Sequence, residues 1–244
     1  MLSFFTKNPR NLSNLGVDMH NHILPGLDDG AVGIEESLKL RQGLKDKGID
    51  TCIFTPHIFK ELYPNNESSI AKKFDLLTAQ TAYKIQYPND RFAAEYMFDH
   101  DFFELLEAGT PLLCIKDKKV LIEFPIIMLP LNYEDVIFKL RLAGYTPILA
   151  HPERYLYLAG KQNKETCIKL KDMGCEFQLN LLSLNGIYGK LVKAFAAELL
   201  KDKMYDYAST DIHHPYQLSD LTVFLKSRTW AKWSKYGFRN SELA

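Results

Sequence analysis

The sequence predicts an α/β protein with one domain, whose parallel strands close into a (β/α) barrel. Apolar strand-like segments alternate with amphipathic helix-like segments along 244 residues, as expected for a parallel sheet. One α/β barrel commonly has about this length. Histidines and carboxylates stand at the ends of several predicted strands, and such side chains converge only where the strand ends form a ring. An open doubly wound sheet would instead gather them at one switch point.

The predicted strands are short runs of aliphatic, β-branched and aromatic residues between turn formers. In chain order they cover residues 15–20, 51–55, 91–98, 112–115, 120–124, 146–150, 176–180 and 205–209. The charged stretch 116–119 separates two of them and predicts a hairpin. Helical segments separate most of the others, so we expect those strands to be parallel.

The predicted helices show apolar residues at helical spacing among charged residues. They cover residues 34–47, 67–87, 101–108, 133–143, 164–173, 190–200 and the segment from 216 onward. In the first, Leu40 and Leu44 lie one turn apart, and Gly48 follows as a helix C-terminal signal. We find no internal repeat or linker. We therefore expect one domain over residues 16–244, preceded by an N-terminal extension over residues 1–15.

Composition excludes several classes of protein. Lys+Arg and Asp+Glu both number 30, so the chain carries no overall charge that would attract nucleic acid or an anionic membrane. No apolar run is long enough to span a bilayer, and the apolar stretch near the start is too short for a signal peptide. The four cysteines are interpreted as small buried hydrophobes in a reducing compartment. These features predict a cytoplasmic protein without membrane insertion and without a nucleic-acid partner.

Five of the seven histidines fall in four short segments that each suit one side of a metal site. His20 and His22 are two residues apart, which places both side chains on one face of a strand. Asp211 and His213 repeat this spacing. The other two segments are Thr55-Pro56-His57 and Ala150-His151-Pro152-Glu153-Arg154. Imidazole and carboxylate are ligands for zinc, manganese or iron.

Glu95 and Glu123 extend this set, because each lies in an apolar predicted strand. A carboxylate there is costly unless it is paired or bound to metal. The alternative is an ion pair with Arg154 or a lysine. Several carboxylates and histidines together suit two or three metal ions, since bridging carboxylates neutralise adjacent cations. His100 is expected to be an exposed residue at a helix start, and His214 could reach a substrate beside His213.

Arg154 follows His151 by three residues and is the natural anion clamp, because its planar fork matches two phosphate oxygens. A structural ion pair with Glu153 or Asp135 is the alternative. A metal cluster beside a guanidinium indicates hydrolysis of a phosphoester. A cysteine-dependent mechanism would need Cys-x₅-Arg, and no cysteine has arginine six residues later.

The longest motif carries a family resemblance. It reads Asp18-Met19-His20-Asn21-His22-Ile23-Leu24-Pro25-Gly26-Leu27-Asp28-Asp29-Gly30-Ala31. It resembles the opening motif of the polymerase-and-histidinol-phosphatase (PHP) superfamily, and within it the bacterial protein-tyrosine phosphatases of capsule and exopolysaccharide operons (the CpsB/YwqE type). The segments around His57, Glu95, Glu123, His151 and Asp211 match in the same order, over residues 18 to about 213.

The resemblance implies a distorted TIM-like (β/α)₇ barrel, the PHP fold, that holds three divalent metal ions, manganese foremost, with iron or zinc as alternatives. By position, the first ion would be held by His20, His22, Glu95 and Asp211. The second would be held by Glu95, Glu123 and His151, and the third by Asp29, His57 and His213. Asp29 occupies the family's ligand position, so Asp28 is expected to brace the loop. Arg154 would orient the phosphate and, with Asp211 and His57, form the catalytic set.

The implied function is a metal-dependent protein-tyrosine phosphatase. Its substrate would be the phosphotyrosine tail of a bacterial tyrosine autokinase that controls capsular or exopolysaccharide synthesis. The chain departs from the family pattern at Asp211-Ile212-His213-His214, where many relatives have Asn after the histidine. The apolar residues near the start and the late Trp230 and Trp233 suit either a barrel cap or a subunit contact in a homo-oligomer.

Three other functions share parts of this pattern. A PHP-type small-molecule phosphatase, such as one for histidinol phosphate, is the nearest alternative and would need a deep closed pocket. A nuclease is disfavoured by the neutral charge. A non-catalytic module that holds a phosphotyrosine tail is disfavoured by the complete set of ligand positions.

Overall fold

Two parallel sheets form the centre of the computed structural model, which describes residues 10–160 and 164–244. One sheet has the order β1-β2-β4 and the other the order β3-β5-β6-β7-β8-β9. The strands are β1 Val17–Asp18, β2 Thr51–Phe54, β3 His57–Ile58, β4 Arg91–Phe92, β5 Glu95–Met97, β6 Lys119–Glu123, β7 Thr146–Ala150, β8 Glu176–Asn180 and β9 Tyr207–Ser209. Neighbouring strands pair in parallel, as the alternating sequence pattern predicts.

The two sheets are continuous, because the boundary between them consists of short interruptions in two long strands. β2 and β3 are separated by Thr55 and Pro56, and β4 and β5 by Ala93 and Ala94. Proline lacks the N–H that regular pairing requires. Hydrogen bonds nevertheless cross the gap, from the Ala93 N–H to the Phe54 carbonyl (2.8 Å) and from the Glu95 N–H to the Pro56 carbonyl (3.1 Å).

The first and last strands also lie side by side at their carboxyl ends. Asn21 and Ile212 form an isolated parallel bridge, and the Asp211 N–H donates to the His20 carbonyl at 2.9 Å. Beneath it, the buried carboxylate of Asp18 accepts hydrogen bonds from the Thr210 N–H (2.8 Å) and hydroxyl (2.7 Å). These contacts bring the histidine-bearing segments at the two ends of the chain together.

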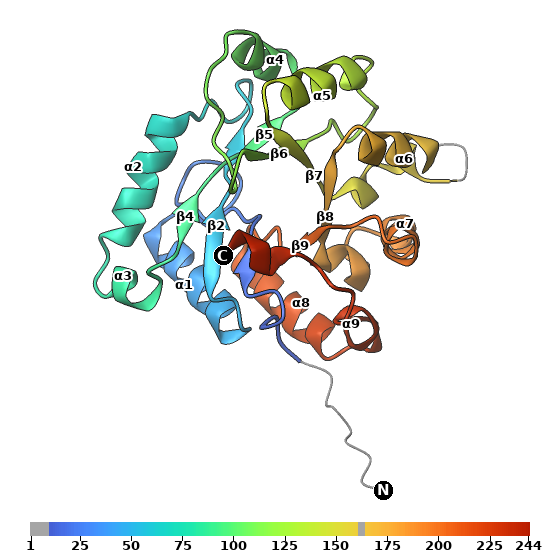
Figure 1. The fold of residues 1–244 in the computed structure, drawn as a ribbon. Helices are drawn as coiled ribbons and strands as arrows, with labels where there is room; N and C mark the ends of the chain where they lie inside the picture. The colour runs from blue at the N-terminus through green and yellow to red at the C-terminus, as the bar shows by residue number, and fades with distance from the viewer. Residues whose placement is uncertain (1–9, 161–163) are drawn as a thin grey trace, which may run out of the picture.

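Helices surround the strands (Figure 1). They are α1 Ile34–Asp46, α2 Glu67–Thr78, α3 Tyr83–Gln86, α4 His100–Glu107, α5 Tyr133–Leu142, α6 Lys164–Asp172, α7 Lys190–Lys201, α8 Pro215–Leu225 and α9 Arg228–Trp233. The described residues also form the 3₁₀ turns η1 Pro152–Arg154, η2 Leu156–Leu158, η3 Leu181–Asn185 and η4 Asn240–Leu243. Among the described residues, no helix is long and apolar enough to cross a membrane.

Two predictions about single elements were wrong. The long helix over 67–87 ends at Thr78, and Ala82 takes a left-handed conformation (φ 64°) before the short α3 begins. The hairpin is reduced to one bridge between Lys116 and Lys119. Residues 112–115 do not form a strand. The Leu112 and Leu113 N–H groups instead donate to the hydroxyls of Tyr145 and Tyr96.

The core has two parts. A large cluster packs the helices onto the outer faces of the strands, whereas a smaller one contains alternate strand residues such as Val17, Ile53 and Leu121. Alternation along a strand sends neighbouring side chains to opposite faces, so the smaller cluster lies on the inner faces. η4 covers this cluster at the amino ends of the strands, where Asn240 donates to the Val17 carbonyl at 2.9 Å. The carboxyl ends are left for polar side chains.

The predicted extension is partly integrated into this core. Leu12 and Leu15 are buried in the large cluster. Residues 1–9, including Leu2, Phe4 and Phe5, lie outside the described residues. Trp230 is buried against Phe224, with 5.7 Å between the ring centroids, so it packs within this chain.

A buried ion pair ties α1 to the start of β2 and to the segment before β4. Arg41 Nε and Nη2 donate hydrogen bonds to the two carboxylate oxygens of Asp90, at 2.6 and 3.0 Å. Asp90 also accepts from the Cys52 N–H and the Tyr83 hydroxyl, both at 2.8 Å. Arg41 is fully buried, so the loss of its partner would leave an uncompensated charge inside the protein.

We expect the substitution Asp90→Ala to lower the free energy of unfolding by about 3–5 kcal/mol, because it leaves a buried guanidinium unpaired. Urea denaturation measures this change. Asp50→Ala is the matched control, since Asp50 pairs with Lys45 at an exposed site and its loss should cost less than about 1 kcal/mol. Equal effects of the two substitutions would contradict this interpretation.

Candidate metal centre

The nine residues predicted as metal ligands meet at the carboxyl ends of β1, β6, β7 and β9 and at the interruptions that follow β2 and β4. His20 and His22 follow β1, His57 opens β3, Glu95 opens β5 and Glu123 ends β6. Asp29 stands in the loop before α1, His151 follows β7, and Asp211 and His213 follow β9. Four groups of these residues have donor atoms within 4.8 Å of one another. The groups are His22-Asp29-His57-His213, His20-His22-Glu95, His20-His151-Asp211 and His57-Glu95-Glu123.

Glu95 occupies the middle of this arrangement. Its Oε2 lies 3.0 Å from His57 Nδ1, 3.2 Å from His20 Nε2 and 3.4 Å from His22 Nε2, and its Oε1 lies 3.4 Å from His151 Nε2. The residue is fully buried, and among the described residues neither oxygen has a hydrogen-bond partner of good geometry. A buried carboxylate surrounded by nitrogen donors at these distances suits a cation between them.

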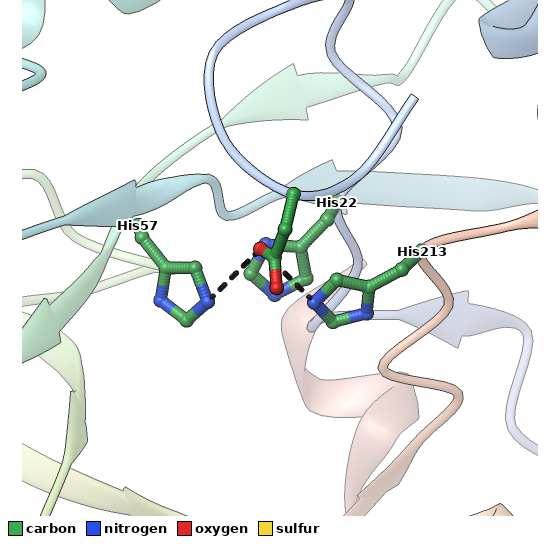
Figure 2. Close-up of side chains that lie close together, drawn as sticks. His22, His57 and His213 are labelled. Atoms are coloured by element: carbon green, nitrogen blue, oxygen red, sulfur yellow. Dashed lines mark ion pairs between the residues drawn. The ribbon is translucent and has the colours of Figure 1, made fainter. Parts of the chain in front are cut away.

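A second group lies nearer to solvent. The rings of His22, His57 and His213 converge (Figure 2), and those of His22 and His213 stack with centroids 3.9 Å apart. The Asp29 carboxylate lies 3.7 Å from His57 Nε2 and 3.6 Å from His213 Nε2. Three imidazoles and one carboxylate form a donor set typical of zinc or other first-row metals.

Asp211 contacts both the buried histidines, His20 and His22, and Arg154. Its Oδ1 lies 3.3 Å from His20 Nε2 and 3.5 Å from His22 Nε2, while its Oδ2 accepts hydrogen bonds from Arg154 Nη1 (3.0 Å) and Asn180 Nδ2 (2.8 Å). Its backbone is left-handed, with φ 50°. A residue with a Cβ adopts this conformation only at a cost, and such strain is common at functional sites.

The pKa values of the centre reflect competition between burial and charge. Burial alone would lower the pKa of His20, but the carboxylates of Glu95 and Asp211 raise it to about 9. Burial and the neighbouring Glu95 raise the pKa of Glu123 to about 7. Burial and Arg154 lower the pKa of His151 to about 4, so this imidazole is neutral at pH 7. A neutral imidazole keeps a free lone pair for a metal ion.

Asp28 supports the centre from behind, as the sequence predicted for this loop residue. Its Oδ2 accepts hydrogen bonds from His22 Nδ1 (2.8 Å) and from the His57 N–H (3.0 Å). Its Oδ1 accepts from the Gly30 N–H at 3.0 Å. The carboxylate therefore orients two histidines and the turn that carries Asp29. Such contacts orient the ring and raise its basicity as a ligand.

Sequence reasoning missed two supporting residues on β8. The Gln178 side-chain oxygen lies 3.0 Å from His20 Nδ1 and accepts from the His151 N–H at 3.3 Å. Asn180 donates to Asp211, as described above. Both are fully buried. The sequence Glu176-Phe177-Gln178-Leu179-Asn180 contained a signal for these residues, because polar side chains alternate with apolar ones and therefore share one face of the strand.

Arg154 has neither of the partners that were proposed as alternatives to phosphate binding. It bonds to Asp211, and its guanidinium lies 4.8 Å from the centre of the Tyr188 ring. Glu153 points elsewhere and accepts from the Asn180 N–H (3.0 Å) and the Tyr205 hydroxyl (2.9 Å). Arg154 is thus held at the edge of the centre with part of its fork free for an anion.

The remaining histidines and the cysteines lie outside the ligand groups. His100 is the first residue of α4 with 84% of its side chain exposed, as predicted. His214 precedes α8, and its ring lies 6.2 Å from that of His213. Cys52, Cys167 and Cys175 are buried, and burial raises the pKa of each thiol. This environment does not suit a nucleophilic thiolate.

A parallel α/β fold with buried histidines and carboxylates at its strand ends defines a metal-binding class of protein. The family model of capsular polysaccharide synthesis proteins, CpsB/CapC, matches residues 16–219. The chain belongs to this family.

Known relatives and a solved structure agree. The chain is 32% identical over 199 residues to the tyrosine-protein phosphatase YwqE of Bacillus subtilis, covering 81% of this chain and 77% of YwqE. It is 28% identical over 239 residues to the tyrosine-protein phosphatase CpsB of Streptococcus pneumoniae, covering 93% of each. A crystal structure from a study of these two proteins, described there as metal-dependent tyrosine phosphatases, superposes with a TM-score of 0.79. It is 28% identical and covers 93% of this chain and 90% of that chain.

We expect Mn²⁺ to raise the thermal stability of the wild-type protein and Glu95→Gln to abolish most of this rise. When the free Mn²⁺ concentration is about one hundred times the dissociation constant, a bound ion adds about 2.7 kcal/mol to the free energy of unfolding. Scanning calorimetry with and without Mn²⁺ measures the difference, and elemental analysis counts the ions retained. Glu104→Gln, on the exposed face of α4, is the control and should respond as the wild type does. An unchanged Mn²⁺ response in Glu95→Gln would exclude this carboxylate as a ligand.

We expect Asp28→Asn to weaken metal binding by about 10–100-fold, because it removes the charge that orients His22 and His57. Competition with a metallochromic chelator measures the affinity. Asp46→Asn removes an exposed carboxylate on α1 and should leave the affinity unchanged. A full-affinity Asp28→Asn protein would mean that the loop holds its shape without this carboxylate.

Proposed function

We propose that this chain is a metal-dependent protein-tyrosine phosphatase. The observation that carries the proposal is Arg154, anchored on Asp211 at 3.0 Å beside a buried cluster of histidines and carboxylates. The names of the relatives support the same activity. They do not favour the histidinol-phosphate alternative.

The proposed centre holds three divalent ions, with Mn²⁺ as the first candidate and iron or zinc as alternatives. The ligand sets proposed from the sequence are His20-His22-Glu95-Asp211, Glu95-Glu123-His151 and Asp29-His57-His213. The donor distances around Glu95 support them, as do the distances from His151 Nε2 to Glu95 (3.4 Å) and Glu123 (3.6 Å). The four groups of close donor atoms differ in detail, because they place His57 with Glu95 and Glu123, and His151 with His20 and Asp211. Divalent ions supply Lewis-acid chemistry to such a centre, lowering the pKa of water and neutralising phosphoryl charge.

The catalytic roles of the chain's own residues follow from their contacts. Arg154 donates a fork of N–H groups to the phosphoryl oxygens, and Asp211 and the Tyr188 ring hold that fork in place. Asp211 also contacts His20 and His213, so it couples the position of the phosphate clamp to that of the ligands. His57 lies between Glu95 and Asp29 with 13% of its side chain exposed, so this ring can contact a bound substrate.

The fold proposed for this activity is a single domain over residues 16–244, closed as a seven-membered ring of strands. Two interrupted strands, β2/β3 and β4/β5, each count once in that ring. The continuous hydrogen bonding across both interruptions and the bridge between Asn21 and Ile212 support closure. A ring is the arrangement that lets seven strand ends contribute to one centre.

The proposed substrate is the phosphotyrosine tail of a bacterial tyrosine kinase in the cytoplasm, within capsule or exopolysaccharide synthesis. The capsular description of the family model supports this setting. A flexible tail suits a centre at the open ends of strands, because an extended segment can bring its phosphotyrosine to the ligands. Assembly into a homo-oligomer is compatible with this role.

We expect Mn²⁺-loaded protein to release phosphate from a phosphotyrosine peptide, and Arg154→Ala to lower kcat/KM by about 10²–10³-fold through loss of charge stabilisation. Colorimetric phosphate release measures both. Arg141→Ala removes an exposed arginine on α5, where Arg141 bonds to the Tyr145 carbonyl; it should retain full activity. Faster turnover of histidinol phosphate or single-stranded DNA than of the peptide would overturn the proposed substrate class. A peptide that binds but survives long incubation with loaded protein would indicate a binding module.

The same assay separates the metal mechanism from a cysteine mechanism. A chelator should abolish phosphate release, whereas alkylation of the thiols should leave it intact. The reverse result would refute the metal mechanism.

A further inference from the structure

Large apolar side chains are exposed on three consecutive loops next to Arg154. Ile126, Ile127, Met128 and Leu131 lie between β6 and α5, Leu156 lies between β7 and α6, and Ile187 lies between β8 and α7. We call these six residues the apolar rim. Ile127 and Leu131 are 91% and 95% exposed. Exposed aliphatic clusters of this kind mark interaction sites on soluble proteins.

The apolar rim is joined to the phosphate clamp through its immediate neighbours. The Tyr157 hydroxyl donates to the Pro125 carbonyl at 2.8 Å, so the loops that carry Leu156 and Ile126 are held together. Ile187 precedes Tyr188, whose ring lies 4.8 Å from the Arg154 guanidinium. The loop with Ile126 begins directly after Glu123 and Phe124. A molecule with its phosphate on Arg154 therefore meets the apolar rim with its adjacent groups.

We propose that the apolar rim binds the residues next to the phosphotyrosine, and that the preferred substrate is a peptide with apolar residues at those positions. This inference rests on the proposed function. A small phosphate ester bound at the metal centre would leave the rim exposed to water, whereas a peptide extends beyond the centre and covers it. Burial of aliphatic surface on both sides then adds to the affinity.

The charges on the first loop of the rim, which carries four of its six residues, favour a peptide over a membrane. Residues 124–135 contain no lysine or arginine and end with Glu134 and Asp135. Segments that bind anionic lipid surfaces carry clustered basic residues, and this segment lacks them.

The test compares two peptides of equal length, one with leucine on both sides of the phosphotyrosine and one with serine there. Wild-type protein loaded with Mn²⁺ should show a higher kcat/KM for the leucine peptide. The double substitution Ile127→Ser/Leu131→Ser should reduce the leucine-to-serine ratio of kcat/KM by about tenfold, the effect of losing two partly buried aliphatic side chains. Both residues are almost fully exposed, so the fold should not depend on them.

The matched control is Ile85→Ser/Leu142→Ser. It makes the same chemical change at two residues that are 86% and 77% exposed. They lie on α3 and at the end of α5, in the connections that lead into β4 and β7, at the opposite end of the strands from the metal centre. This variant should keep the wild-type ratio.

A wild-type ratio near one, or an unchanged ratio in the rim variant, would overturn the proposal even if phosphate is released. With that ratio unchanged, rim-dependent binding to phosphatidylglycerol vesicles would assign the rim to a membrane, and rim-dependent self-association would assign it to a second copy.

Absence of phosphate release from both peptides would refute the proposed function alone. Calorimetric titration of the two peptides into the loaded protein then gives the same preference as a ratio of dissociation constants.

Discussion

The buried carboxylate of Glu95 is the constraint on which the centre depends. It lies within 3.4 Å of nitrogens from four histidines: His20 and His22 in the connection after β1, His57 in β3 and His151 in the connection after β7. A charge in this position cannot be left uncompensated in the protein interior. The pairing of β3 with β5 aligns His57 with Glu95, and the pairing of β5 with β6 aligns Met97 with Glu123. Parallel register therefore sets which of these side chains lie together.

Backbone strain at two strand ends supports this arrangement. His151 and Asp211 are the first and second residues after their strands and have left-handed φ values of 32° and 50°. Each such conformation costs on the order of 1–3 kcal/mol. Hydrogen bonds hold both turns, from the His151 N–H to Gln178 and from the Asp211 N–H to the His20 carbonyl. The turn after His151 forms η1, which carries Arg154 toward Asp211, so the strained turn helps to position Arg154.

Much of the fold was predictable because its signals are local. Alternating apolar segments indicated parallel strands and surrounding helices, and the ends of α1, α5 and α6 fall within one residue of their predicted positions. The failures occurred where tertiary contacts compete with local preference. Residues 112–115 have strand-like composition, but the Leu112 and Leu113 N–H groups bond to the hydroxyls of Tyr145 and Tyr96. The periodicity over 67–87 does not reveal the left-handed residue Ala82.

The sequence by itself indicated which histidines and acids lie together, since such residues at apolar strand ends are costly without a partner or a function. It also determined the parallel α/β class. Only the tertiary structure decided how these residues are grouped, that Arg154 pairs with Asp211, and that Gln178 and Asn180 support the ligands from β8. It alone brought the apolar loops after β6, β7 and β8 beside Arg154. The physical reason is distance along the chain: these contacts join residues from opposite ends of the sequence, such as His20 and Asp211, and no local pattern encodes the register that unites them.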